Sequence, residues 1–402
     1  MAPACGKRAL ALGGGGFTGY LFEIGALTAL DDLVEDGTGM NDLDLYVGVS
    51  AGAAAASLIA NGVTPREILE TNLSGTRPYY FDHRNVFSPA IGEGLKPLWR
   101  VTRQLVPLLK LYVRHYREMT LIDLLDKAQD ALPSGIYTLE PFAAYLSAIF
   151  KARRLSDTFA GLSKELYIPA IDLETGDGVM FGDEGWREVP ISRAVTASSA
   201  VPIYFCPVRI HGRDYIDAGI GRMAFFEIAV HKHVDFTIMI NPMVRAPQRR
   251  SSPGGTAEKR VRERGFLSIG EQASRINYDA RFSHALERFQ HDHPDKEVLV
   301  ISPVEEDALL FERSFLSYRD RIHLLRAGYM SVTMLARDRF ETLSAQFARH
   351  GMPLSRMTFE ERARGRLAAL HQAETEVLPR APQSVAAPVC VGGVGVAWRK
   401  AK

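Results

Sequence analysis

Two apolar runs near the N-terminus each lead directly into a glycine-rich turn and then into a helical pattern. Residues 9–12 run into LGGGGFTGY, and residues 43–49 run into GVSAG ahead of an alanine-rich stretch at 51–60. Glycine adopts positive φ without steric cost, so it lets a chain turn sharply at the end of a buried strand. Continuous apolar strands that alternate with helices are typical of a parallel sheet covered on both faces. These two units therefore predict an α/β fold.

The rest of the chain keeps this alternation. Helical patterns follow the two turns at about 17–35 and at 51–60, and helix formers dominate 310–350. Further strands are expected at residues 166–173, 179–181, 207–211, 215–217, 234–240 and 298–301. We expect a three-layer α/β/α sandwich with a mainly parallel central sheet, a helical insertion and a C-terminal helical extension.

Three segments depart from the pattern of strands and helices. Residues 96–117 carry six Lys or Arg and no acidic residue among apolar ones. Residues 247–265 are polar, basic and rich in turn formers, which is typical of a mobile loop. The residues from about 379 onward are rich in Ala, Pro, Val and Gly, and they are expected to form a flexible tail.

Composition and charge exclude several classes of protein. The chain has 402 residues, of which 46% are hydrophobic and 24% charged, as in ordinary globular proteins. A net charge of +1 argues against a nucleic-acid partner held by overall charge. Its three cysteines, Cys5, Cys206 and Cys390, indicate neither a disulfide framework nor a thiolate metal site, so no metal is expected. Without a secretory signal pattern at the N-terminus, we expect a cytoplasmic protein.

The first glycine-rich turn is suited to binding an anion, since its N–H groups can point into one concavity. Gly14, Gly16 and Gly19 have the spacing of the dinucleotide-binding fingerprint. That fingerprint also expects an acidic residue at the end of the next strand, where this chain has the GVSAG turn instead. A nucleotide-binding module remains an alternative, and a transient oxyanion is the other candidate anion.

The second turn has the G-x-S-x-G pattern, formed by Gly48, Ser50 and Gly52. Such a turn exposes a serine hydroxyl at the sheet edge, and the following helix directs its positive end at the same place. Ser50 is therefore a candidate nucleophile, although it could also be a simple helix N-cap. A serine nucleophile needs a base.

Two kinds of base are available for Ser50. A Ser-His-Asp esterase would use a histidine, with His211, His231 or His233 as candidates. Asp217 is the other candidate, because it ends an apolar strand and is followed by small residues. In a dry cleft its pKa could rise enough for it to accept a proton. The segment ASSAVP at residues 197–202 precedes it.

These motifs, in this order, resemble those of the patatin-like phospholipases, over roughly residues 8–245. The resemblance implies that the glycine loop forms the oxyanion hole, that Ser50 is the nucleophile, and that Asp217 of Asp217-Ala-Gly219 completes a dyad without histidine. It implies backbone donors at Gly14, Gly15 and Gly16, and motif-supporting glycines at Gly13, Gly19, Gly48, Gly52 and Gly219.

Two positions depart from the family pattern. The loop usually carries arginine just before its last glycine, where this chain has Thr18, and the usual D-G-[GA] becomes D-A-G with Ala218. Activity is still expected, because the backbone donors of the loop remain. A catalytically silent lipid-binding protein is the alternative that these two departures raise.

The resemblance implies an enzyme that transfers an acyl group from a lipid ester to Ser50 and then to water, with no cofactor. Trp99 and Tyr112 among the cations of residues 96–117 suit peripheral contact with a membrane surface. The oligomeric state is left open. The implied division is a catalytic domain at 1–305 with an insertion at about 90–135, a helical extension at 306–378, and a tail at 379–402.

Overall fold

A computed structural model describes most of the chain. The described residues are 6–35, 37–81, 83–90, 133–221, 224–244, 261–304, 314, 316–318 and 320–377. The basic segment at 96–117, most of the expected loop at 247–265 and the tail at 379–402 lie outside the described residues. The predictions for these three segments therefore stay predictions.

The central sheet is mainly parallel, as predicted. Its strand order is β11-β10-β1-β2-β5-β9-β8, with β6 paired to β5. The first five strands of this order run parallel, whereas β6, β9 and β8 pair antiparallel. The strands span Lys7–Leu12 (β1), Leu45–Gly48 (β2), Glu165–Asp172 (β5), Gly178–Phe181 (β6), Val208–Ile210 (β8), Arg213–Asp217 (β9), Val234–Ile240 (β10) and Glu297–Ile301 (β11).

A second, smaller sheet was not expected from the sequence. It has the order β3-β4-β7 and consists of Ser88–Pro89 (β3), Gly135–Thr138 (β4) and Ile203–Phe205 (β7). These strands are two to four residues long. Such short strands show no periodic pattern, so only their tertiary pairing defines them.

Helices cover both faces of the central sheet. The α-helices span Gly16–Leu33 (α1), Ala51–Ala60 (α2), Pro65–Ser74 (α3), His83–Val86 (α4), Glu140–Arg153 (α7), Ile191–Ser198 (α8), Ala224–His231 (α9), Phe266–Asp292 (α10), Arg321–Arg349 (α12) and Arg356–Val377 (α13). Short 3-10 helices occupy Phe159–Gly161 (η2), Ala218–Ile220 (η3) and Val261–Arg264 (η4). The predicted helices at 17–35 and 51–60 correspond to α1 and α2.

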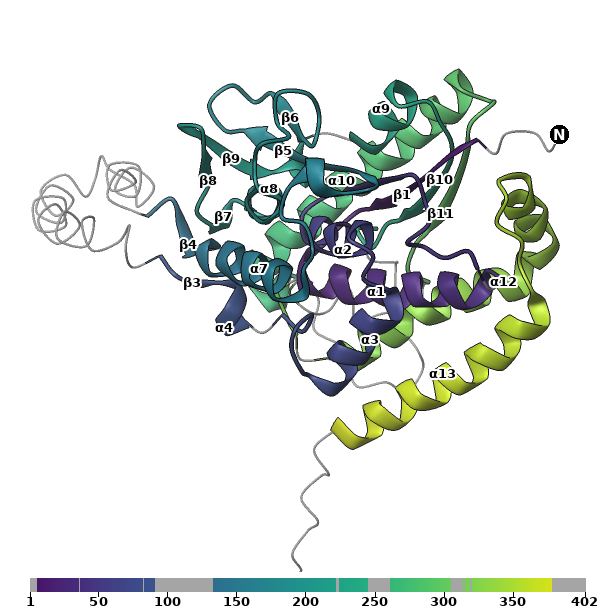
Figure 1. Cartoon of the computed structure of the whole chain (residues 1–402). Coiled ribbons are helices and arrows are strands. Elements are labelled where there is room, and N and C mark those ends of the chain that lie inside the picture. Colours follow the sequence, from purple (N-terminus) through teal and green to yellow (C-terminus); the bar gives the residue numbers. More distant parts are fainter. Residues whose placement is uncertain are drawn as a thin grey trace, which may run out of the picture.

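The alternating side chains of β1 show how the sheet is buried on both faces. Leu10 and Leu12 belong to a core that includes α1, α2 and α12. Ala9 and Ala11 belong to a second core with the aromatic residues of α9 and α10. In Figure 1, α1 and α12 lie on one side of the strands, and α9 and α10 lie on the other. This arrangement is the predicted three-layer sandwich.

Helix α12 packs against α1 with the two backbones in direct contact. A Cβ atom on Gly25 of α1 would lie 1.9 Å from the carbonyl oxygen of Leu325, and one on Gly328 of α12 would lie 1.9 Å from that of Phe22. Neither position has space for a side chain. The helix that begins at the glycine loop is therefore held at its middle by the C-terminal part of the chain.

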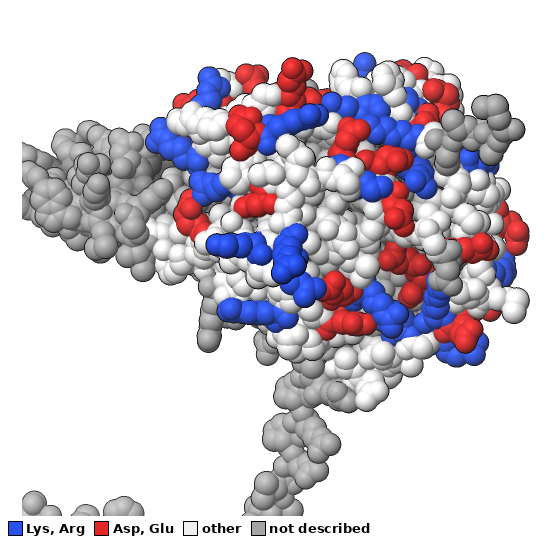
Figure 2. Space-filling model, viewed as in Figure 1, with Lys and Arg blue, Asp and Glu red and all other residues white. Residues whose placement is uncertain are grey.

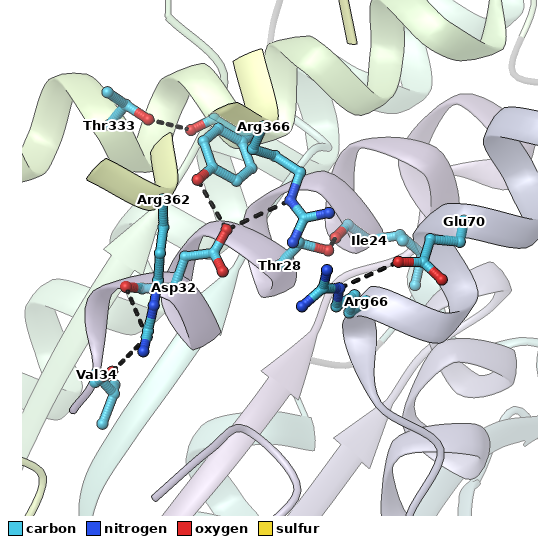
Figure 3. Close-up of polar contacts among 10 residues, drawn as sticks. Ile24, Thr28, Asp32, Val34, Arg66, Glu70, Thr333, Arg362 and Arg366 are labelled. Carbon is cyan, nitrogen blue, oxygen red and sulfur yellow. Dashed lines mark hydrogen bonds and ion pairs between the residues drawn. The ribbon is translucent and has the colours of Figure 1, made fainter. Parts of the chain in front are cut away.

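The C-terminal end of α1 is held by α12 and α13 (Figure 3). The hydroxyl of Tyr329 donates to Oδ2 of Asp32 at 2.9 Å, and Nε of Arg366 lies 3.5 Å from the same oxygen. Nη1 of Arg362 donates to the carbonyl oxygens of Asp32 and Val34, both at 3.4 Å. Cations at this end of a helix satisfy its free carbonyls and oppose its dipole.

The molecular surface carries charges of both signs. Figure 2 shows Lys and Arg interspersed with Asp and Glu on the face seen in Figure 1, in keeping with the net charge of +1. Of the helices within the described ranges, none is both long and apolar enough to cross a bilayer.

Candidate active site

Ser50 lies at the sharp turn between β2 and α2. Its φ of 55° and ψ of −130° are rare for a residue with a side chain, and such strain is most often found at functional positions. The flanking glycines make the turn possible. A Cβ on Gly48 would lie 2.5 Å from Cα of Ala53, and one on Gly52 would lie 2.7 Å from the carbonyl oxygen of Leu12.

The register of β5 places Asp217 beside Ser50. Val47 of β2 pairs with Tyr167 of β5, and Ala170 of β5 pairs with Asp217 of β9. Ser50 is three residues beyond Val47, and Ala170 is three residues beyond Tyr167. The serine and the aspartate therefore reach the same level on opposite sides of β5, although 167 residues separate them in sequence.

The carboxyl group of Asp217 is buried and hydrogen-bonded. Its exposed fraction is 4%, and that of Ser50 is 7%. Burial raises the pKa of Asp217 to about 6, against the lowering effect of hydrogen bonds from the Ser50 side chain and the Gly219 N–H. The Gly219 N–H donates to Oδ1 at 2.7 Å. At neutral pH this carboxylate is ionised, yet it accepts a proton more readily than an exposed aspartate does.

The ASSAVP segment at residues 197–202 positions both side chains. Oγ of Ser198 accepts a hydrogen bond from the Ser50 N–H at 3.0 Å. The carbonyl oxygen of Ala200 accepts one from the Asp217 N–H at 3.1 Å. Ser198 is completely buried at the end of α8. This segment therefore connects the nucleophile turn to the aspartate strand.

The glycine loop lies directly against Ser50, the candidate nucleophile. Gly14, Gly15 and Gly16 have φ values of 76°, 106° and 65°. A Cβ on Gly14 would lie 2.9 Å from Cβ of Ser50, and one on Gly19 would lie 2.0 Å from the carbonyl oxygen of Gly14. The N–H of Gly13 donates to the carbonyl oxygen of Ile240 at 2.9 Å. The loop is thus fixed between β10 and the Ser50 turn.

Only two of the three predicted oxyanion donors are free in this structure. The N–H of Gly14 donates to Oε1 of the buried Glu23 at 2.7 Å, so that donor is already used. The N–H groups of Gly15 and Gly16 find no acceptor in the described part of the chain. Gly16 also begins α1, where the helix dipole favours negative charge. The structure therefore leaves the N–H groups of Gly15 and Gly16 available, and the assignment of the oxyanion hole stays a prediction.

Helix α10 contributes a contact that no sequence motif indicates. Arg281 donates from Nη1 to the carbonyl oxygen of Gly221 at 2.7 Å and from Nη2 to that of Gly219 at 3.1 Å. Gly219 is the residue whose N–H bonds Asp217. Arg281 thereby holds the turn that follows the aspartate.

The two positions that depart from the family pattern are both buried. Thr18 is inaccessible to solvent, and its hydroxyl donates to the carbonyl oxygen of Gly15 at 3.2 Å. Ala218 has an exposed fraction of 1% and lies in η3, next to Asp217. Thr18 therefore adds a contact within the loop, and Ala218 fits without displacing the Asp217–Gly219 hydrogen bond.

The three candidate histidines are all exposed. His211 lies in the turn between β8 and β9 and stacks on Trp186 at 6.1 Å. His231 is the last residue of α9, and His233 lies two residues later, in the turn that follows. None of them hydrogen-bonds Ser50 among the contacts of the described residues. The same residues contain no group of three or more His, Cys, Asp or Glu side chains placed to hold a metal.

A cavity of about 830 Å³ lies away from these residues, between the end of α1 and α13. Its charged lining includes Asp31, Asp32 and Glu361 with Arg362 and Arg366, the last three of which belong to α13. Arg362 and Arg366 already bind the end of α1, as Figure 3 shows. None of the predicted site residues lines this cavity.

Comparison with solved structures gives weak likenesses. VipD from Legionella pneumophila shares 13% identity over 94% of this chain and 89% of its own, with a TM-score of 0.29. ExoU from the type III secretion system of Pseudomonas aeruginosa, solved in complex with SpcU, shares 15% identity over 95% of this chain and 72% of its own, also with a TM-score of 0.29. At this score neither alignment carries an argument.

Comparison of sequences is more decisive. No curated protein matches the chain at a significant level. The family model for patatin-like phospholipase, however, matches residues 10–230, which is more than half of the 402 residues. This range contains the glycine loop, the G-x-S-x-G turn and Asp217, all in the order that the resemblance requires. The chain therefore belongs to the patatin-like phospholipases, a family of enzymes that hydrolyse lipid esters.

Proposed function

We propose that this enzyme cleaves lipid acyl esters, in the manner of a phospholipase A or lysophospholipase, through a Ser50–Asp217 dyad. The observation that carries the proposal is the contact between the strained Ser50 and the buried Asp217, whose pKa is raised to about 6. The N–H groups of Gly15 and Gly16 support it, because they have no acceptor in the described part of the chain and are available to the oxyanion of an acyl-transfer step.

Acylation begins with Asp217 as general base. The Ser50 hydroxyl attacks the ester carbonyl carbon, and its proton passes to the Asp217 carboxylate. The carbonyl oxygen becomes an oxyanion, which the Gly15 and Gly16 N–H groups stabilise together with the positive end of α1. When the tetrahedral intermediate collapses, the proton on Asp217 goes to the leaving alcohol, and Ser50 keeps the acyl group.

Deacylation repeats the same steps with water. Asp217 takes a proton from a water molecule as its oxygen attacks the acyl-enzyme carbonyl, and the same N–H groups hold the second oxyanion. Collapse returns the proton from Asp217 to Ser50 and releases the fatty acid. The reaction balances without a cofactor, since one carboxyl alternates between base and acid.

The test is labelling of the protein by a fluorophosphonate, followed by intact-mass measurement. We expect one adduct on the natural chain, none on Ser50→Ala, and a rate lower by about 10²- to 10⁴-fold on Asp217→Asn, the usual contribution of a general base. Ser57→Ala is the matched control, because Ser57 is a buried serine within α2 and its hydroxyl donates to the Ala54 carbonyl oxygen, away from Asp217. An adduct that persists in Ser50→Ala would overturn the dyad.

We further propose that the enzyme acts in the cytoplasm and contacts the membrane surface through residues 96–117. The support is compositional, with six cations and no acidic residue in that stretch. Reversing the charges of Arg100, Arg103 and Lys110 should weaken sedimentation with anionic vesicles while leaving fluorophosphonate labelling unchanged. Vesicle binding that survives the triple reversal would count against the contact.

A further inference from the structure

Glu23 is a fully buried carboxyl group that the proposed mechanism does not use. It lies in α1, where fifteen of the eighteen residues are buried and most are apolar. Its exposed fraction is 0%. An ionised carboxylate in such a place costs many kcal/mol, so a buried carboxyl is normally neutral or paired. Burial raises the pKa of Glu23 well above its ordinary value, so burial favours the protonated form of this group.

The contacts of Glu23 join the two catalytic turns. Side chains of an α-helix point back toward its N-terminus, so Glu23 reaches the loop that precedes α1. Its Oε1 accepts a hydrogen bond from the Gly14 N–H at 2.7 Å. A Cβ on Gly52 would lie 3.0 Å from this same oxygen. Glu23 therefore occupies the space between the glycine loop and the start of α2.

The peptide that Glu23 binds is directly beside the nucleophile. A Cβ on Gly14 would lie 2.4 Å from the carbonyl oxygen of Val49 and 2.9 Å from Cβ of Ser50. The next two N–H groups along the chain are those of Gly15 and Gly16. A rotation of the peptide before Gly14 would move the N–H groups of Gly15 and Gly16 relative to Ser50. The hydrogen bond to Glu23 opposes that rotation.

We propose that Glu23 is a positioning residue of the oxyanion hole: by accepting the Gly14 N–H, it keeps the N–H groups of Gly15 and Gly16 directed at the substrate carbonyl oxygen above Ser50. This inference rests on the proposed function. Glu23 does not touch the substrate and transfers no proton. Its carboxyl oxygen supplies an acceptor to the Gly14 N–H, which has no other partner in the described part of the chain.

The test compares two substitutions of similar volume. Glu23→Gln keeps an uncharged acceptor, and Glu23→Met removes it. The measurements are kcat and KM for a soluble short-chain nitrophenyl ester, together with the rate of fluorophosphonate labelling. We expect Gln to retain kcat within about threefold and Met to lower kcat and the labelling rate by about 10²-fold, the usual effect of a lost oxyanion donor, with little change in KM.

Thr28→Val is the matched control in the same helix. Thr28 is also buried, and its hydroxyl donates to the Ile24 carbonyl oxygen at 2.8 Å, away from the loop. It should lose stability without losing kcat. Thermal unfolding of each variant shows whether it is folded at the assay temperature. If Glu23→Met is unfolded there, Glu23→Leu takes its place, and the assay is run below the unfolding midpoint of Glu23→Leu.

The outcomes separate this inference from the proposed function. If the natural chain is not labelled at Ser50, the proposed function has failed, and the role of Glu23 fails with it. If the natural chain is labelled and hydrolyses the ester, but Glu23→Met matches it in kcat, only the positioning role is overturned. A loss in Glu23→Gln as large as that in Glu23→Met would also overturn it, because a hydrogen-bond acceptor at position 23 would then not be the property that matters.

Discussion

At the scale of single residues, the buried carboxyl of Asp217 predicts how activity depends on pH. The group must be ionised to accept the Ser50 proton, and its pKa is raised to about 6 by burial. We therefore expect kcat/KM to rise with pH through about 6 and to level off above it. A pH profile with a soluble ester measures this. A rise centred near 4, the value for an exposed aspartate, would contradict it.

The same shift predicts how stability depends on pH. The pKa of Asp217 is raised from 3.8 when unfolded to about 6 when folded, so the folded state binds more protons between these values. The contribution of this group is most favourable below pH 4 and is lost as pH rises through 6. Asp217→Asn should therefore gain about 1 to 3 kcal/mol of unfolding free energy at pH 8 and little at pH 4. Urea denaturation at both pH values measures the difference, and equal gains would contradict it.

Candidate site residues could be found from the sequence where a short motif contains them. Ser50 and Asp217 were identifiable because the G-x-S-x-G turn and the D-A-G sequence are local signals. The distance between these two residues could not be predicted from the sequence, because it depends on the antiparallel pairing of β9 with β5. Glu23 gave one visible sign, a lone carboxylate in an apolar helix, but nothing in the sequence showed that Gly14 would be its partner.

At the scale of elements, helix α10 is expected to support the aspartate turn through Arg281. Arg281→Met removes the hydrogen bonds to the carbonyl oxygens of Gly219 and Gly221. Since small displacements of catalytic groups are costly, we expect kcat to fall by about 10-fold with a smaller change in KM. Arg288→Met on the same helix is the control, because Arg288 is exposed and its ion pair with Asp292 lies within α10. Equal effects of both substitutions would assign Arg281 a general structural role.

Elements were predictable where their pattern is local. The limits of α2 follow from the serine turn before it and Asn61-Gly62 after it, and the runs of β1 and β10 read directly as buried strands. Helix α10 was not predicted, because its burial contradicts hydropathy. Arg275 is buried, whereas Phe266 is 80% exposed and Ile276 is 50% exposed. Tertiary packing of α10 against α9 and the sheet, which the sequence does not show, explains which face is inside.

At the scale of the whole molecule, the C-terminal helices are expected to be required for folding of the hydrolase. The division at residue 305 remains a prediction from the sequence, yet α12 shares one core with α1 and α2. A chain ending at residue 305 would leave the α12-facing side of α1 exposed. We expect it to lack cooperative unfolding and fluorophosphonate labelling, whereas a chain ending at residue 378 keeps both. A labelled, cooperatively unfolding 1–305 chain would contradict this.

The close approach of α1 and α12 at Gly25 and Gly328 has a consequence for how such chains can diverge. Relatives that exchanged their C-terminal halves by recombination would bring together an α1 and an α12 with separate histories. Because neither helix tolerates a Cβ at this crossing, only pairs that both retain glycine would fit, and a mismatched pair would shift the helix on which the glycine loop is built. The inheritance of the catalytic motifs is thereby linked to a position in α12, nearly three hundred residues after Ser50 in the chain and outside the matched family region.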